Sequence, residues 1–158
     1  MGYRLDAVIA TERVLRGLAC GEAAIIVPLG QHLSLLPVTD AFFDAVTVAG
    51  APKLEKFWKA PAGFGQMLAA CSTNGPVAYV QADSFGGRGS QSAQVWDGGT
   101  VVLGPLHLAV GERSPAAGSP ISQALRRLGA VAGDHSDEFD AVGLARHRDA
   151  EGWLPPTS

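Results

Sequence analysis

The stretch VAYVQADSFGGRGSQSAQVWDGGTVVLG, residues 77–104, decides the fold that the sequence predicts. Its first seven residues have a period of two, so side chains from Val77 to Asp83 face alternate sides, as in a half-buried strand. SQSAQVW and TVVLGPL read as two further strands joined by a DGG turn, because glycine reaches positive φ without a steric penalty. Three successive strands with short connections predict an antiparallel meander, and the helices predicted around it make the fold class α+β.

The segment SFGGRGSQ, residues 84–91, connects the first two of these strands. A glycine-rich loop binds phosphate when it leads from a strand into a helix, where backbone amides and the helix dipole converge on the anion. The residues after this loop are typical of a strand, and neither G-x-x-x-x-G-K-[ST] nor G-x-G-x-x-G is present. The glycines therefore predict a hairpin tip or a bulge.

Three side chains in this segment go beyond what a turn requires. Phe85 lies close to Arg88 in the sequence, and an exposed aromatic with an arginine is a combination that anchors protein interfaces. Arg88 also suits a carboxylate or a phosphate, through two parallel hydrogen bonds. We predict a partner-binding surface formed by Phe85, Arg88 and Gln91.

The first half of the chain predicts strands of different kinds. A first strand is expected over YRLDAVIA, residues 3–10, followed by a helix that ends at the stop signal Gly21. The apolar run AAIIVPLG, residues 23–30, predicts a buried strand that pairs beside the first. HLSLLPVT, residues 32–39, predicts an edge or short strand, because Pro37 lacks the amide that a central ladder needs.

Four further helices are predicted from apolar spacing and from end signals. The clearest is SPISQALRRLG, in which Ser119 is the N-cap, Pro120 takes the first helical position and Gly129 ends the helix. Another is expected to start late, because Gly63 and Gly65 each cost about 1 kcal/mol relative to alanine. The four helices are expected at residues 40–46, within 57–72, at 119–129 and from Asp137 to about His147.

The composition is that of one folded domain. The chain has 158 residues, of which 47% are hydrophobic and 17% charged, enough apolar surface for a single core. A formal net charge of -3 gives no field that would attract nucleic acid. The basic group Lys53, Lys56 and Lys59 has the spacing of a solvated helix face. We expect a single domain over residues 1–154 and a tail at 155–158.

No segment of the sequence predicts a membrane or secretory protein. The first residues carry Asp6 and Glu12 and lack a long apolar run, and no run approaches the roughly 20 residues of a membrane-spanning helix. Cys20 and Cys71 lie outside any metal-ligand spacing, so both are expected to be buried thiols. We predict a cytoplasmic protein with no membrane or nucleic-acid partner, and we expect no metal or other cofactor.

No catalytic residue is assigned from the sequence. GDHSDEFDAVGLARHRD, residues 133–149, holds several acidic residues and two histidines, but its charges also suit the two ends of a helix. Asp6 and Asp83 lie on or near predicted strands, where burial would suit a carboxyl to proton transfer, and solvent exposure is the ordinary expectation. No spacing brings any of the four histidines to a particular serine.

In the segments SFGGRGSQSAQVW and PISQALRRLG…DEFDAVGLARHR, the chain resembles a family of small actinobacterial proteins with a Phe-Gly-Gly-x-Gly hairpin and an acidic-to-basic terminal helix. The likeness covers most of the chain, and its motifs are not signatures of an established activity. In size and α+β make-up the chain is also similar to immunity proteins, which neutralise a partner toxin. The resemblance implies a protein partner and carries over no catalytic residue.

We therefore predict a non-catalytic protein-interaction module, in the manner of an immunity-like inhibitor. The alternative is a small enzyme or ligand-binding domain with a pocket beside the loop at residues 84–91. A third possibility is a homodimer whose sheet edge pairs with its copy. A flat exposed patch around Phe85 would favour a protein partner, whereas a deep pocket with converging polar groups would favour a ligand.

Overall fold

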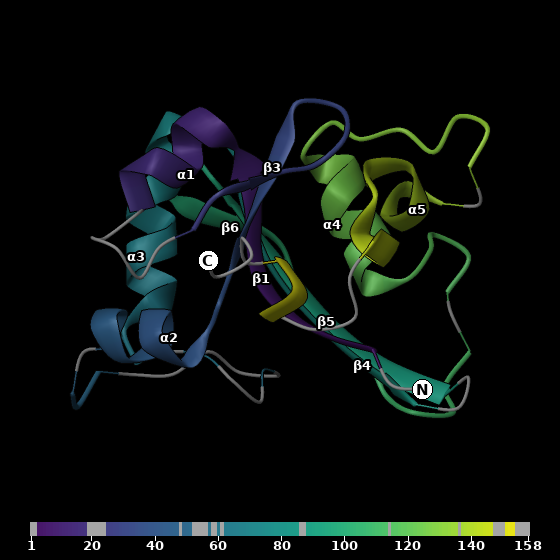
Figure 1. Ribbon diagram of the computed structural model, residues 1–158, viewed down its shortest axis with the longest axis horizontal. Coiled ribbons are helices and arrows are strands. Elements are labelled where there is room, and N and C mark those ends of the chain that lie inside the picture. The colour runs from purple at the N-terminus through teal and green to yellow at the C-terminus, as the bar shows by residue number, and fades with distance from the viewer. Residues whose placement is uncertain are drawn as a thin grey trace.

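Six antiparallel strands form a single sheet, and helices cover both of its faces (Figure 1). The computed structural model describes residues 3–18, 25–47, 49–51, 57, 60, 62–85, 88–113, 115–135, 137–146 and 151–153. The strand order is β2-β3-β1-β4-β5-β6. The strands are β1 Tyr3–Thr11, β2 Val27–Pro28, β3 Leu33–Pro37, β4 Val77–Phe85, β5 Arg88–Asp97 and β6 Thr100–Leu108. The helices are α1 Glu12–Leu18, α2 Asp40–Val46, α3 Phe64–Cys71, α4 Pro120–Arg127 and α5 Glu138–Val142, with short 3-10 turns at Ser72–Asn74, Leu144–Arg146 and Glu151–Trp153.

Helices α1, α2 and α3 cover one face of the sheet, which we call the α1–α3 face (Figure 1). Strand residues of alternate positions, such as Val8, Tyr79 and Trp96, are buried there against the helices. Phe64 of α3 makes edge-to-face contacts with Phe42 of α2, with ring centroids 6.1 Å apart, and with Tyr79, at 5.2 Å. The aromatic rings therefore join two helices to the middle of the sheet.

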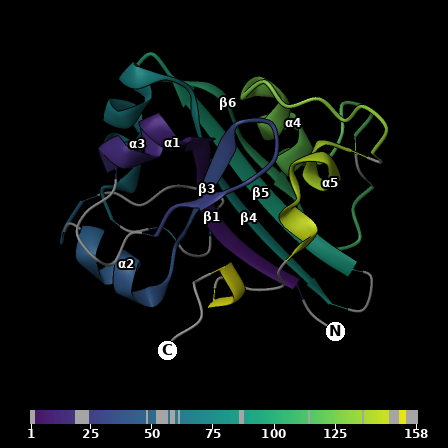
Figure 2. The same ribbon diagram turned by 45° about the horizontal axis from the view of Figure 1, so that its top comes forward.

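Helices α4 and α5 cover the opposite face, the α4–α5 face, as the turned view in Figure 2 also shows. The intervening strand positions, among them Leu5, Ile9 and Val80, are buried there. Ile121 and Leu125 of α4 complete this core, because their spacing places them on one side of the helix. Trp153 is buried in the same cluster.

The α+β fold and the antiparallel meander predicted from the sequence are confirmed. Strands β4, β5 and β6 follow one another in the chain and in the sheet, and Gly98 and Gly99 both have positive φ in the turn that joins β5 to β6. Ser119 caps α4 through its side chain and Pro120 is the first helical residue, as predicted. Helix α3 begins at Phe64, directly after Gly63 in the left-handed conformation, so the predicted late start is also confirmed.

One strand prediction in the first half of the chain is wrong, and a second is confirmed in one of its two alternatives. The apolar run at residues 23–30 gives only the two-residue strand β2 in its described part, and β2 pairs with β3 instead of β1. β3 is short, as predicted, but it is not an edge strand, because it lies between β2 and β1 with all five residues buried. Pro37 is tolerated because it is the last residue of the strand.

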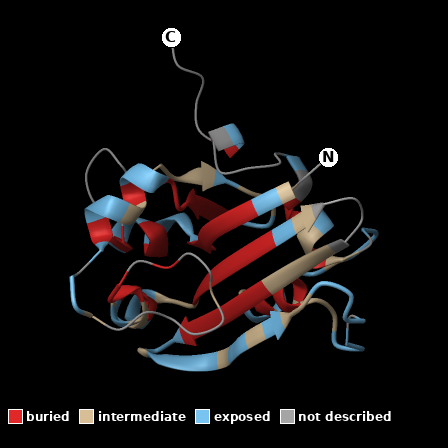
Figure 3. Ribbon diagram, turned by 90° about the horizontal axis from the view of Figure 1, so that it is seen from below, coloured by how far each residue is buried: buried red, intermediate tan, exposed pale blue. Residues whose placement is uncertain are grey.

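Two further predictions need correction. The last helix ends at Val142, because Gly143 adopts a left-handed conformation and a 3-10 turn follows, so it is shorter than the predicted span from Asp137 to about His147. β4 is buried on both faces over most of its length, where a half-buried strand was predicted, because α1–α3 cover its polar side as well (Figure 3).

The predicted lysine face at residues 53–59 lies outside the described residues, apart from Phe57. Among the described helices, none combines the length and the apolar character needed to cross a bilayer.

Candidate functional site

The predicted partner-binding loop is a tight hairpin between β4 and β5. The ladder ends with Phe85 opposite Arg88, so only two residues connect the strands. Close strand packing explains why residue 89 is glycine. A Cβ built there would lie 2.7 Å from the Cβ of Ser84 on the facing strand, which is too close for any side chain. The loop leads from strand to strand, and this excludes the strand-to-helix geometry of a phosphate-binding loop.

The structure describes the side chain of one of the three predicted partner-binding residues, Gln91. Phe85 and Arg88 form the last pair of the hairpin ladder, and their side chains lie outside the described part of the structure. Gln91 is half-buried and lies three residues further along β5. Its side-chain oxygen accepts a hydrogen bond of 3.1 Å from the backbone amide of Ile121, in the first turn of α4. Gln91 therefore attaches α4 to the strand that carries the hairpin.

A polar row crosses the α1–α3 face, and the sequence did not predict its burial. Asp6, Gln81, Ser92 and His107 occupy facing positions on β1, β4, β5 and β6. The first three are buried, whereas His107 on the edge strand is exposed. The expected solvent exposure of Asp6 is thus wrong, because β1 lies in the middle of the sheet under the α1–α3 helices; Asp83, two residues beyond Gln81, is exposed as expected.

Hydrogen bonds hold the Asp6 end of this polar row. The side-chain amide of Gln81 donates to Asp6 Oδ1 at 2.8 Å and lies 3.4 Å from the hydroxyl of Tyr79. Arg4 Nε lies 3.3 Å from the other carboxylate oxygen of Asp6. Burial raises the pKa of the Tyr79 phenol well above its usual value, and the nearby Asp6 carboxylate adds to this effect. The row keeps a buried carboxylate satisfied, which is what burial of a charged group requires.

Ser92 and His107 form the one serine–histidine hydrogen bond among the described residues, with Oγ and Nδ1 2.8 Å apart. A nucleophilic serine must be reached by its substrate and needs a histidine oriented by a third group. Ser92 is completely buried within the sheet, and no acidic side chain of the described residues bonds to His107. The alternation of SQSAQVW is the sequence signal that puts Ser92 on the same side of the strand as other polar residues. It does not reveal His107 as the partner, because that contact depends on the register between β5 and β6. The pair therefore lacks the substrate access and the orienting acid that a nucleophilic serine needs.

A pocket of about 380 Å³ lies between the start of α4 and the start of α5. The loop at residues 116–119, Ser122 and Arg126 form one side, and residues 132, 137 and 138 form the other. Gln91 reaches the first turn of α4, so the pocket and the hairpin strand are joined through this helix.

Within the described part of the chain, no group of three or more His, Cys, Asp or Glu residues could hold a metal ion. Cys71 is a buried free thiol, as predicted, and Cys20 lies outside the described residues.

Comparison of the chain with known protein families, with curated proteins and with solved structures finds no match. The resemblance to a small actinobacterial family therefore stays a prediction.

Proposed function

We propose that the chain is a non-catalytic protein-interaction module that docks its partner through the tip of the β4–β5 hairpin. The observation that carries this proposal is the reach of the hairpin. Its ladder runs to the pair Phe85–Arg88, beyond Ser84 and Gln91, the last residues that pair with β1 and β6 in the described structure. Because this end of the ladder is paired with neither β1 nor β6 in the described structure, we infer that it is open to a partner, and it carries an aromatic residue and an arginine, which are typical interface anchors.

The chemistry of the described residues supports a binding role over catalysis. The buried polar groups of the sheet are paired with one another, and Ser92 is closed to substrate. The raised pKa values belong to Tyr3, Tyr79 and the Cys71 thiol, and burial is the main cause in each case. Such shifts make these groups poor proton donors and nucleophiles near neutral pH.

An immunity-like inhibitor is the form of interaction that we favour. Such a protein occludes its partner, and a short hairpin with two anchoring side chains suits this purpose, because a hairpin whose strands are paired loses little backbone entropy on binding. The hairpin is held on one side by β1 and on the other by β6, and Gln91 ties its second strand to α4. In this proposal the partner is a protein of the cytoplasm, the location that the sequence predicts.

A homodimer is the second candidate, and the exposed edge of the sheet favours it. Among the described strands, β6 pairs with β5 alone, and most of its residues are exposed (Figure 3). Val101 is 46% exposed and lies on this edge. Pro105 lacks a backbone amide, so it limits the edge that a second copy could pair with.

The test of this proposal first identifies the partner protein and then measures its affinity. Proteins retained by the immobilised chain from a lysate of the source cells are identified by mass spectrometry, and the most abundant one is produced and titrated by calorimetry. We expect the Phe85→Ala and Arg88→Ala variants each to weaken binding at least about thirtyfold, the effect of losing about 2 kcal/mol at an interface anchor.

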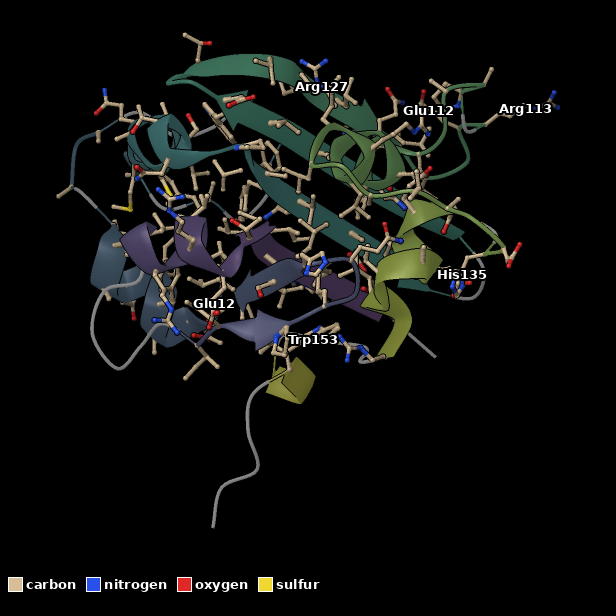
Figure 4. All side chains as sticks on the ribbon, turned by 90° about the horizontal axis from the view of Figure 1, so that it is seen from above. Glu12, Glu112, Arg113, Arg127, His135 and Trp153 are labelled. Carbon is tan, nitrogen blue, oxygen red and sulfur yellow. The ribbon has the colours of Figure 1, made fainter. Side chains whose placement is uncertain are left out.

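Controls separate loss of contact from loss of fold. Arg113→Ala removes an exposed arginine of the segment between β6 and α4 and should leave binding unchanged (Figure 4). Gln91→Ala should lower stability through α4 as well as affect binding, because its side chain bonds to the backbone of Ile121. Unchanged affinity in the Phe85 and Arg88 variants would overturn the proposal. A chain that elutes as a dimer, with no other protein retained, would support the homodimer instead.

A further inference from the structure

The outer strand β6 is the longer of the two edges of the sheet, and its own side chains lack the charges that usually protect an edge. β6 has nine residues, whereas β2 at the opposite edge has two. The sequence of β6, TVVLGPLHL, contains no Lys, Arg, Asp or Glu. Such charges on an edge strand hinder its pairing with a strand of another molecule. An uncharged edge of this length therefore needs another form of protection.

Two large apolar side chains near the start of β6 are exposed to solvent. Val101 is 46% exposed and Val102 is 36% exposed. Both belong to the segment Thr100–Leu103, which precedes Pro105, so the amide that proline lacks does not interrupt the edge there. β-branched residues on an open edge favour pairing with a further strand.

A β-bulge interrupts the ladder between β5 and β6 at Val102. Trp96 faces Val101 and Val95 faces Leu103, so the register passes over Val102. The extra residue of a bulge is left unpaired in the ladder, and its backbone groups are open to other partners.

Arg127 of α4 bonds to this bulged residue. Its Nη2 donates to the backbone oxygen of Val102 at 3.2 Å, across 25 residues of the chain (Figure 4). The adjacent Arg126 instead donates to Ala117 O at 2.6 Å and forms an ion pair with Glu138. Of two neighbouring arginines on one helix, Arg127 is therefore the one that reaches the edge strand.

The Arg127 guanidinium supplies the charge that β6 itself lacks. It occupies a carbonyl oxygen beside the exposed valines, so an incoming strand would have to displace it. Two copies that paired across a twofold axis near Val102 would also bring their Arg127 side chains close together, and like charges that face each other oppose pairing. Arg127 thus acts against association both by its bond and by its charge.

A second copy of the chain is the partner that the edge would otherwise take. Antiparallel pairing about a twofold axis sets β6 against the same strand of the other copy, and Thr100–Leu103 brings no charge of its own into such a pair. The two-residue strand β2 is too short to receive β6 of another copy. Pairing between copies is therefore pairing of β6 with β6.

We propose that Thr100–Leu103 is a latent pairing surface for a second copy of the chain, and that Arg127 keeps it closed. The chain is then a monomer with Arg127 in place, and loss of the guanidinium opens the edge. This inference does not rest on the docking of a partner by the Phe85–Arg88 pair, because that pair lies at the other end of β5. A homodimer through β6 would require Arg127 to leave Val102.

Sedimentation velocity of the full chain over a range of concentrations tests the role of Arg127. We expect the unaltered chain to be monomeric at about 100 µM, and Arg127→Ala to dimerise with a dissociation constant at least about tenfold lower. Arg126→Ala is the matched control, because it removes the same charge from the same helix but not the bond to Val102, and it should stay monomeric. Circular dichroism shows whether each variant is folded.

A second pair of variants tests the surface itself. In the Arg127→Ala background, Val101→Lys returns a charge to the edge and should restore the monomer. Val131→Lys is its control, because Val131 is 66% exposed but lies between α4 and α5, and it should leave the dimer intact. A folded Arg127→Ala variant that stays monomeric, or an unaltered chain that is already dimeric, would overturn the closing role of Arg127. A dimer that persists with Val101→Lys would overturn the assigned surface.

Discussion

The two faces of the sheet are built from the same strands but differ in the polarity of the side chains that they bury. On the α4–α5 face, the strand side chains that enter the core are apolar, from Leu5 on β1 to Val95 on β5. On the α1–α3 face, apolar residues share the strands with the buried polar row that begins at Asp6. The α4–α5 face buries apolar strand side chains and makes its hydrogen bonds through the half-buried Tyr3 and Gln91, whereas the α1–α3 face also has to satisfy polar groups that are fully buried in the sheet.

This difference shows where each face gets its stability. The α4–α5 face packs against the apolar stripe of α4, which consists of Ile121, Ala124 and Leu125. The α1–α3 face combines aromatic contacts with paired polar groups, and a polar pair depends on the register of the strands. The second face therefore specifies the order and alignment of the strands more strongly than the first.

The largest expected effect is the loss of an aromatic ring from the α1–α3 face. Phe64 is completely buried between Phe42 and Tyr79, so Phe64→Ala should lower the free energy of unfolding by about 3–5 kcal/mol. Urea denaturation measures this value. Phe43→Ala is the matched control, since Phe43 is only half-buried on α2, and it should cost clearly less. Similar losses in the two variants would mean that the aromatic contacts of Phe64 do not distinguish this face.

A smaller effect is expected when the polar row is interrupted. Gln81→Leu introduces an apolar side chain of similar size and removes the amide that donates to Asp6. Because hydrogen bonds to charged groups contribute about 1.5–3 kcal/mol, the free energy of unfolding should fall by that amount. Asp83→Asn changes an exposed residue on the same strand and the same face, and it should stay within about 0.5 kcal/mol of the unaltered chain. A neutral or stabilising Gln81→Leu would show that the polar row costs as much as it contributes.

The parts of the fold that the sequence predicted correctly are those with local signals. The turn glycines at 98 and 99, the Ser119 cap and the apolar spacing of α4 are each encoded within a few residues. The apolar run at residues 23–30 has no such signal for its pairing partner, since it is equally compatible with several neighbours. Its position beside β3 depends on how the whole sheet assembles.

The candidate sites also differ in how far the sequence predicts them, because only some of their contacts are local in the sequence. The hairpin was visible because its glycines and flanking strands adjoin in the sequence. The bond from Gln91 to the backbone of Ile121 spans 30 residues, and the pocket joins a loop before α4 to residues at the start of α5. The burial of Asp6 likewise follows from the neighbours of β1 in the sheet, which no spacing within YRLDAVIA records.

The smallest effect is a dependence on alkaline pH that compares the two faces through the two tyrosines of the chain. Tyr3 packs against Phe139 on the α4–α5 face and its hydroxyl donates to Leu144 O, whereas Tyr79 lies on the α1–α3 face. Burial raises the pKa of both phenols above their usual value, and for Tyr79 the Asp6 carboxylate raises it further. Both phenols therefore stay neutral in the folded protein at a pH where they ionise in the unfolded chain.

The sign follows from proton binding. Above a pH of about 10, the unfolded phenols lose protons while the folded ones keep them, so the free energy of unfolding falls by at most about 1.4 kcal/mol per pH unit for each tyrosine. Stability is unaffected by these groups below that pH. We expect near-ultraviolet phenolate absorbance to appear only as the protein unfolds, and Tyr3→Phe and Tyr79→Phe each to remove about half of the slope. A phenol that ionises near its ordinary pKa while the protein stays folded would show that water reaches that face of the sheet.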